Sequence, residues 1–462
     1  MAYSSMRVVV FGAGLVGEAL GRHIADQGNN VCFIEANANT VRKIREQMDV
    51  QIVHGTAEDQ EALREAGVQN ADLILAVTNQ DKSNIILTLI ARSLNPMARI
   101  ITRVRDEEFL DNRLLWKSST LADTIVISPE RAVIEKAIHI LEVQHAFDVV
   151  EFLDGELRIA GFRLSAGNLL AGKPLKKSHA LFPSANILVV GAERGDEVII
   201  PTGETILEEG DRIFLTLPQS IDLHAILPLL GKRPVTRQKF VIAGGSAIGE
   251  HIARQLALKG QQAVIIESDY ERCVTLSETL KNAILLHGDV TDASLLSRAI
   301  TPETVFLAVT ASQEVNFLIS LLAQKRGAMQ VITMMDNEAY YTMAPELGVD
   351  AILSPRAAAV GSILRFIRMG RVLDANLLLG GKLDIFLTEI KSGSSLDNIS
   401  LKDVEFPQGV IVAAAIRNKD VVVPHGNLRM QEGDFAVFVI RPGRAAVLDD
   451  LIAPRRTLRL PL

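Results

Sequence analysis

A glycine-rich segment followed by an acid is the first feature of this sequence that could do chemistry. It comes directly after the apolar run RVVVF, and it consists of Gly12, Ala13, Gly14, Leu15, Val16 and Gly17. In a strand–turn–helix, such glycines permit a tight turn, let the backbone approach a pyrophosphate and let the helix pack closely, while the helix N-terminus favours the anion. We therefore predict a nucleotide-binding loop; the alternative is a structural glycine turn.

The acid is Glu35, which closes the next apolar run, NVCFIE. A carboxylate at this spacing accepts hydrogen bonds from ribose hydroxyls, and its charge disfavours a 2′-phosphate. The expected ligand is therefore NAD(H) or an adenine nucleotide such as ATP or ADP, in preference to NADP(H).

The same pattern returns later in the chain with one change. Its members are Gly244, Gly245, Ser246, Ala247, Ile248 and Gly249, with Glu267 as the following acid. Ser246 stands where the second glycine belongs, so a Cβ and a hydroxyl would crowd a phosphate, although a serine can also donate a hydrogen bond to one. This second site is expected to be weaker; the alternative is a purely structural fold element.

Further candidates lie where other strands of each expected sheet end. Thr78 and Asn79 end the fourth strand of the first half, and Arg103 ends the fifth, where it could pair with a phosphate. The alternative for Arg103 is a solvated arginine with a packed stem. In the second half, Thr310 corresponds to Thr78, but Met334 replaces Arg103 and cannot supply charge.

Other polar residues near these strand ends have simpler interpretations. His54 and His287 follow the third strand of each half without a paired nucleophile nearby in sequence, so we expect a role in loop structure. Glu58 and Asp81 are expected to be solvated loop acids, with cation binding as the alternative. We predict no metal site and no catalytic group, and the missing acid/base residue argues against a dehydrogenase.

The elements that must position these residues occur twice. Arg7–Glu18, RVVVFGAGLVGE, is repeated by Lys239–Glu250, KFVIAGGSAIGE, at a shift of 232 positions. Ser128-Pro129 recurs as Ser354-Pro355, and the segment Glu-Gly-Asp at 209–211 recurs at 432–434. The whole first half is therefore repeated in order, which indicates an internal duplication.

Each half has two parts. Short apolar runs that alternate with helical patterns predict an α/β fold, a Rossmann-like domain with a doubly wound parallel sheet. Shorter strands among turn pairs then predict a small α+β C-terminal module. The expected divisions are Rossmann-like domains at 6–128 and 239–354, crossover helices at 129–147 and 355–373, small modules at 148–230 and 374–455, and a linker at 231–238.

Composition narrows the class of protein. The 462 residues are 48% hydrophobic and only 5% aromatic, and the net charge is −7, so nucleic acid is not an expected partner. The longest stretch without a charged residue, Ser178 to Ala192, is too short to span a membrane, and the N-terminus has no secretory pattern. We expect a cytosolic protein whose two cysteines, Cys32 and Cys273, are buried small hydrophobes.

On these motifs the chain resembles the TrkA family, the cytosolic NAD-binding regulators of bacterial Trk potassium uptake systems. The resemblance covers essentially the whole chain and rests on GAGLVG with Glu35, AVTNQDKSN at 76–84, Arg103, ISPERA at 127–132, and the repeated module ending in EEGD and QEGD. It implies tandem domains of the kind that regulate potassium conductance. It also implies a non-enzymatic protein, attached to the inner face of the membrane, whose nucleotide-driven movement gates a potassium-translocating subunit.

Two further expectations concern assembly and alternatives. The helical segments at 84–94 and 316–324 are apolar on most sides, so each must be covered by its own chain or by a neighbouring domain. We expect the second, with four chains forming a ring of eight nucleotide domains. The alternatives to the Trk function are a nucleotide-sensing module of another channel or transporter and an NAD-dependent oxidoreductase.

Overall fold

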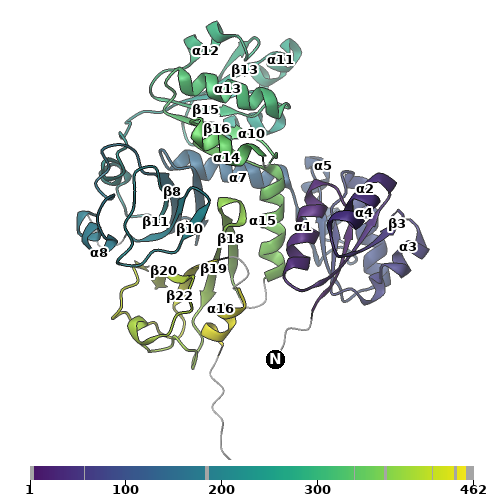
Figure 1. Ribbon diagram of the computed structural model, residues 1–462. Coiled ribbons are helices and arrows are strands. Elements are labelled where there is room, and N and C mark those ends of the chain that lie inside the picture. Colours follow the sequence, from purple (N-terminus) through teal and green to yellow (C-terminus); the bar gives the residue numbers. More distant parts are fainter. Residues whose placement is uncertain are drawn as a thin grey trace, which may run out of the picture. The chain divides into compact units, whose positions relative to one another are not determined.

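The computed structural model of the chain divides into two compact units (Figure 1). The first contains Met1–Ala132 and Pro355–Leu364, and the second contains Val133–Ser354 and Arg365–Leu462. The structure describes residues 5–56, 58–182, 187–337, 339–368, 372–418, 420–441 and 445–453.

A parallel sheet forms the centre of the first unit. Its strands are β1 (Arg7–Phe11), β2 (Asn30–Glu35), β3 (Gln51–His54), β4 (Leu73–Ala76), β5 (Arg99–Arg103) and β6 (Thr124–Ile127). They lie in the order β3-β2-β1-β4-β5-β6, so the direction of winding reverses between β1 and β4. In a doubly wound sheet, ligands bind at the carboxyl edge beside this reversal.

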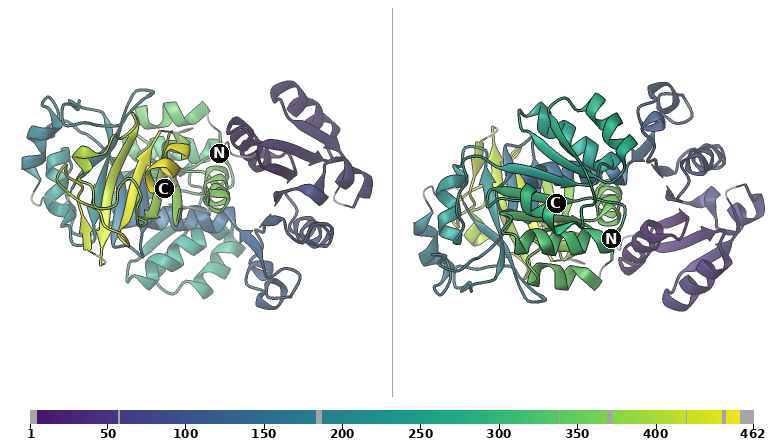
Figure 2. Two further views of the ribbon diagram at one scale, coloured as in Figure 1. Left: turned by 90° about the horizontal axis from the view of Figure 1, so that it is seen from below. Right: turned by 90° about the horizontal axis from the view of Figure 1, so that it is seen from above.

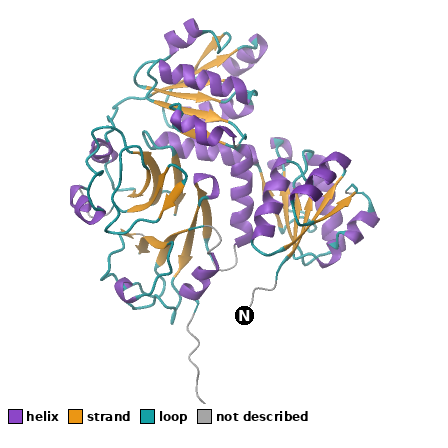
Figure 3. Ribbon diagram, viewed as in Figure 1, coloured by secondary structure: helices purple, strands orange, loops and turns teal. Residues whose placement is uncertain are grey.

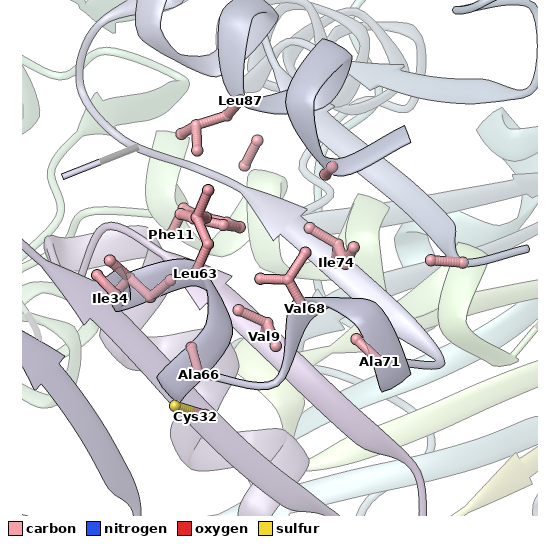
Figure 4. Close-up of a cluster of buried hydrophobic side chains, with 14 of the residues drawn as sticks. Val9, Phe11, Cys32, Ile34, Leu63, Ala66, Val68, Ala71, Ile74 and Leu87 are labelled. Carbon is pink, nitrogen blue, oxygen red and sulfur yellow. The ribbon is translucent and has the colours of Figure 1, made fainter. Parts of the chain in front are cut away.

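Helices cover both faces of this sheet (Figures 2 and 3). They are α1 (Leu15–Asp26), α2 (Ala38–Gln47), α3 (Gln60–Glu65), the 3₁₀ helix η1 (Val68–Asn70), α4 (Asp81–Leu94), α5 (Glu107–Leu110) and α6 (Arg113–Trp116). Figure 4 shows the core on one face, where Val9 and Phe11 of β1 pack with Leu63 of α3 and Leu87 of α4. Because strand residues alternate in direction, Val8 and Val10 are buried on the other face.

The second unit holds a second parallel sheet with the same topology. Its strands are β12 (Lys239–Ala243), β13 (Ala263–Glu267), β14 (Ala283–His287), β15 (Thr304–Ala308), β16 (Gln330–Met334) and β17 (Ala351–Leu353), in the order β14-β13-β12-β15-β16-β17. Its helices are α10 (Ala247–Leu258), α11 (Tyr270–Thr279), α12 (Ala293–Ala299), α13 (Gln313–Lys325) and α14 (Ala339–Glu346). Two Rossmann-like domains are therefore present, as the sequence predicts.

Two antiparallel sheets form the small modules, which confirms the predicted fold class. The first contains β7 (Asp148–Phe152), β8 (Leu157–Arg163), β9 (Val189–Arg194), β10 (Glu197–Ile199) and β11 (Arg212–Pro218), with α8 (Leu175–Ser178), η2 (His179–Leu181), α9 (Leu223–Ile226) and η3 (Leu227–Leu230). The second contains β18 (Asp374–Leu378), β19 (Leu383–Glu389), β20 (Val410–Arg417), β21 (Asp420–Val422) and β22 (Phe435–Ile440), with η4 (Leu379–Gly381), η5 (Leu401–Asp403) and α16 (Ala445–Ile452).

The repeated Glu-Gly-Asp segment has a structural role in these modules. Its last residue in the first module, Asp211, accepts two hydrogen bonds from the guanidinium of Arg194 at 2.9 and 2.8 Å. In the second module Asp434 accepts the equivalent pair from Arg417 at 2.8 and 2.6 Å. Both acids are buried, so each bidentate pair satisfies a charge that would otherwise destabilise the module.

Longer helices connect the domains to the modules. These are α7 (Pro129–Glu142) and α15 (Pro355–Arg368). Within the second unit, the chain just after α7 binds the segment predicted as a linker, because the side chain of Gln144 bonds both the N–H and the carbonyl of Val235, at 3.0 and 2.7 Å. His145 Nε2 also lies 2.9 Å from the carbonyl oxygen of Arg233. The segment at 231–238 is thus held along this part of its own unit.

A buried asparagine joins neighbouring strand ends in each Rossmann-like domain. Asn84 on α4 accepts from the N–H and hydroxyl of Thr78 at 2.9 and 2.6 Å, and its amide donates to the carbonyl of Arg103 at 2.9 Å. Asn316 on α13 makes the same bonds to Thr310, at 2.8 and 2.7 Å, and to the carbonyl of Met334, at 3.0 Å. The amide therefore holds the carboxyl ends of two strands together at this edge of the sheet.

Replacing this asparagine should loosen the edge locally. Asn84→Ala leaves buried backbone groups without partners, and each such group costs about 1–3 kcal/mol. We expect faster hydrogen exchange in β4 and β5 and a lower free energy of unfolding of the first unit. Asn316→Ala should change β15 and β16 instead, and Ser83→Ala, one position before Asn84, serves as a control. Unchanged exchange in β4 and β5 of Asn84→Ala would contradict this role.

The Arg417–Asp434 pair in the second module should make the stability of the protein depend on pH. Burial by itself raises the pKa of Asp434, but the bonds from Arg417 and from the N–H of Gln431 outweigh it, and the pKa lies below its usual value. A lowered folded-state pKa stabilises the protein above the unfolded value, and this contribution is lost as the pH falls through the folded value. Asp434→Asn should therefore lower stability by about 2 kcal/mol at pH 7, and the difference from wild type should shrink below pH 4.

Thermal melts followed by circular dichroism at pH 7 and pH 3 would measure this difference. Asp403→Asn, at an exposed acid of the same module, is the matched control and should change little at either pH. If Asp434→Asn were less stable than wild type by the same amount at both pH values, loss of the carboxylate charge would not be the cause of its lower stability.

Candidate functional site

The predicted loop forms a tight turn between β1 and α1. Gly12 has φ +90°, and a Cβ at Gly17 would lie 1.9 Å from the carbonyl oxygen of Gly12, so both positions require glycine. Gly14 is the N-cap of α1 and offers no side chain to the first helical turn. The N–H groups of that turn therefore face the carboxyl edge of the sheet without a side-chain cap, which is the arrangement that binds anions.

Glu35 lies beside this turn, at the end of β2. Its Oε2 accepts from the N–H of Ala13 at 2.7 Å, and its Oε1 accepts from the N–H of Asn37 at 2.8 Å. Each carboxylate oxygen keeps a second lone pair that a hydroxyl could use. The spacing of the motif predicts an acid close to the loop, but the bond to Ala13 is a feature that only the structure reveals.

The ends of β4 and β5 carry the remaining predicted residues of the first site. Thr78 bonds Asn84, the carbonyl of Asn79 accepts from the guanidinium of Arg105, and Arg103 is half-buried at the last position of β5. The structure thus brings the loop, Thr78, Asn79 and Arg103 to one edge of one sheet.

Asp81 is not the solvated acid that the sequence suggests. Its side chain is only 10% exposed, and it accepts from the backbone N–H groups of Arg105 and Asp106 at 3.0 and 2.8 Å. Asp81 Oδ1 also pairs with Nε of Arg105 at 3.4 Å. The acid at the start of α4 is largely shielded from solvent because it anchors the segment after β5.

Arg105 is a candidate that sequence reasoning missed. No motif marks it, because its place beside Asn79 depends on the bonds to Asp81. The only signal available was its position two residues beyond the end of a strand, next to Arg103. Arg103 and Arg105 bring two basic residues to this edge, and the Arg105 guanidinium is bonded to Asp81 and to the Asn79 carbonyl. Basic residues at such an edge suit an anionic ligand.

The second loop has the same backbone frame. Gly244 has φ +107°, and a Cβ at Gly249 would lie 2.1 Å from the carbonyl oxygen of Gly244. Glu267 accepts from the N–H of Gly245 at 2.7 Å and of Asp269 at 2.9 Å. Burial alone raises the pKa of Glu267, but these N–H donors outweigh it and lower the pKa overall, so this acid is held as a carboxylate.

The hydroxyl of Ser246 has partners within its own domain. Ser246 is the N-cap of α10, and its hydroxyl accepts from the N–H of Gly249 at 3.4 Å and donates to the carbonyl of Val309 at 3.1 Å. The hydroxyl is thus bonded to its own domain. Ala247, Ile248 and Thr310 lie around it at the same sheet edge.

The histidines and cysteines lie where structural residues are expected. His54 Nε2 is 3.0 Å from the carbonyl oxygen of Ala36, and His287 Nε2 is 3.1 Å from that of Ser268, so each joins two loops. Both cysteines are buried, and burial, with the nearby Glu65 carboxylate, raises the pKa of Cys32 to about 12. Within the described ranges, no group of three or more His, Cys, Asp or Glu side chains could hold a metal ion.

Family models match most of the chain. The TrkA-N domain matches residues 8–129 and 240–355, which contain the two parallel sheets, and the TrkA-C domain matches 159–229 and 386–453 in the small modules. No helix among the described residues is long and apolar enough to cross a membrane.

Solved structures with a related fold cover nearly the whole chain. The GsuK RCK domain has a TM-score of 0.59 at 19% identity, with 98% of this chain and 96% of that chain covered. The GsuK channel has a TM-score of 0.61 at 18% identity, with 98% and 80% covered, and it has also been solved bound to NAD. These similarities support the fold of tandem domains.

Relatives match along almost their whole length. The Trk system potassium uptake protein TrkA of Halomonas elongata is 30% identical over 94% of this chain and 96% of its own length. The protein of the same name from Vibrio alginolyticus is 26% identical, with 97% and 99% covered, and the TrkA homolog of Archaeoglobus fulgidus is 30% identical, with 93% and 96% covered. With two matched copies of both domain models, and relatives matched along almost their whole length, this chain belongs to the TrkA family.

Proposed function

We propose that this protein is the nucleotide-binding regulatory subunit of a Trk-type potassium uptake system. It binds NAD(H) or an adenine nucleotide and thereby gates a potassium-translocating membrane subunit, to whose cytoplasmic side it attaches. The names of its full-length relatives support a role in potassium uptake, and the geometry of the first glycine-rich loop supports a nucleotide as the ligand. It is a regulator without catalysis of its own.

The arrangement of residues at the carboxyl edge of the first parallel sheet is the observation that supports a nucleotide ligand. The uncapped start of α1 offers N–H groups to a pyrophosphate, with Arg103 at the end of β5 and Arg105 two residues beyond it to balance its charge. Glu35 lies on the other side of the turn, bonded to Ala13, where a ribose hydroxyl could donate to it. A pyrophosphate and a ribose together describe NAD(H), ADP or ATP.

We also propose that four chains assemble into a ring. In α4, Leu87 and Ile85 are buried in the domain, but Ile86 and Leu89 are 44% and 38% exposed. In α13, Ile319 is buried while Leu318 is 50% exposed. The hydrophobic core of each domain thus covers one side of its helix. The apolar residues exposed on the other side support contact between neighbouring domains.

Growth at limiting potassium tests the function directly. A strain that lacks its own regulator should regain growth with this gene, and Gly14→Asp should abolish the rescue because a carboxylate would face the pyrophosphate. Gln69→Asp adds the same charge to an exposed residue of η1 and should preserve growth. Full rescue by Gly14→Asp would refute the role of nucleotide in gating.

Calorimetry should show a preference for NAD(H) over NADP(H). Two charges about 4 Å apart repel by about 4 kcal/mol at an effective dielectric constant of 20, and a third of this is a tenfold difference in affinity. Glu35→Gln keeps an acceptor for Ala13 but removes the charge, so it should narrow the preference. Equal affinities in the wild-type protein would contradict the assignment of Glu35 to the ribose.

Light scattering coupled to gel filtration should give about four times 50.3 kDa when nucleotide is present. Replacing Ile86 and Leu89 together by Asp should reduce the mass, because both side chains would carry charge into the contact. Leu258→Asp, at an exposed residue of α10, is the control and should not change it. A monomer at micromolar concentration under every nucleotide condition would exclude the ring.

A further inference from the structure

The two glycine-rich loops have similar backbone conformations, but the side chains around them form different hydrogen bonds. Gly14 and Ser246 are both N-caps with similar backbone angles. Gly14 has φ −70° and ψ −173°, and Ser246 has φ −59° and ψ 170°. The difference therefore lies in the side chains around the turn rather than in its path.

We infer that the second half takes no nucleotide phosphate because its own residues occupy the phosphate side of the loop, so that each chain responds to one nucleotide, bound by its first half. This inference rests on the proposed nucleotide binding at the first loop. It assigns Ser246, Arg272 and Asp336 as the residues that determine this asymmetry.

Ser246 removes a donor that a phosphate would use. Its hydroxyl accepts from the N–H of Gly249, in the first turn of α10, and is fixed in place by its bond to the carbonyl of Val309. In the first half the corresponding N–H belongs to Gly17, and Gly14 offers it no side-chain acceptor. An N-cap serine and an incoming phosphate compete for the same N–H groups.

Arg272 holds the second loop against α11. Its Nε donates to the carbonyl of Gly245 at 2.8 Å, and its Nη2 donates to Glu250 at 2.7 Å. A Cβ at Gly245 would lie 2.6 Å from Cδ1 of Leu276 on the same helix, so the alanine that the first half carries there would require the Leu276 side chain to move. The arginine is thus committed to the protein's own backbone.

Charge at the sheet edge is reversed. In the first half, Asp81 accepts from the N–H groups of Arg105 and Asp106. In the second, Gln313 accepts from the N–H groups of Asp336 and Asn337 at 2.7 and 3.1 Å.

These matching bonds place Asp336 at the position of Arg105, as the bonds of Asn84 and Asn316 place Met334 at that of Arg103. The Asp336 carboxylate also accepts from the hydroxyl of Ser354 at 2.6 Å. Two cationic side chains are therefore replaced by a neutral one and an anionic one, while Gln313 replaces the anionic Asp81. The formal charge of these three positions thus changes from +1 (Asp81, Arg103 and Arg105) to −1 (Gln313, Met334 and Asp336), which disfavours a phosphate.

The stoichiometry of binding tests the inference. Titrating the full chain with NADH in a calorimeter should give one site per chain, lost in Gly14→Asp and kept in Ser246→Asp. Two sites per chain, or loss of binding in Ser246→Asp, would overturn the inference while leaving the proposed function intact. Absence of any binding by the wild-type chain, with either NADH or ATP as the probe, would instead overturn the proposed function.

Introducing a serine N-cap into the first loop tests whether such a cap competes with a phosphate. A Cβ at Gly14 meets nothing within 4 Å, so Gly14→Ser has room to copy Ser246. We expect at least tenfold weaker NADH binding with an unchanged or higher Tm, because the hydroxyl would cap α1. Gly14→Ala adds the carbon without the hydroxyl and should bind more tightly than Gly14→Ser; equal affinities of Gly14→Ser and wild type would refute the competition.

Discussion

The close approach of helix to strand at each glycine-rich turn is the constraint on which the rest of this structure depends. A carbonyl oxygen of the turn occupies the place that a Cβ of Gly17 or Gly249 would need. This contact makes α1 and α10 begin at the carboxyl edge of their sheets, directly above the reversal in strand order. Every other candidate residue matters because it lies at that same edge.

Polar side chains hold the edge in shape before any ligand arrives. Glu35 bonds the turn, Asn84 joins β4 to β5, and Asp81 anchors the segment that carries Arg105. Residues suited to a ligand are therefore also parts of the scaffold. This dual use favours binding with little reorganisation, because the groups are already oriented.

The duplication separates what the fold requires from what a ligand requires. The buried asparagine and the bidentate arginine–aspartate pair are retained in both halves, because a buried polar group without its partner destabilises the protein. The residues that line the loop have diverged in charge and in capping, because those changes leave the sheet and its core intact. In this proposal, one half senses the nucleotide and the other retains the architecture.

Much of this protein was determined by its sequence alone. The repeat, the doubly wound sheets, the small modules and the Gly12–Glu35 constellation follow from hydrophobic period and glycine spacing, which are local properties of a chain. The roles of Asp81, Arg105, Ser246 and Asp336 were decided only by tertiary structure. Each depends on a partner brought close by folding: Asp81 bonds a loop 24 residues away, and Ser246 bonds a strand end 63 residues away. Side-chain hydrogen bonds between distant segments leave no period in the sequence, so only the folded chain reveals them.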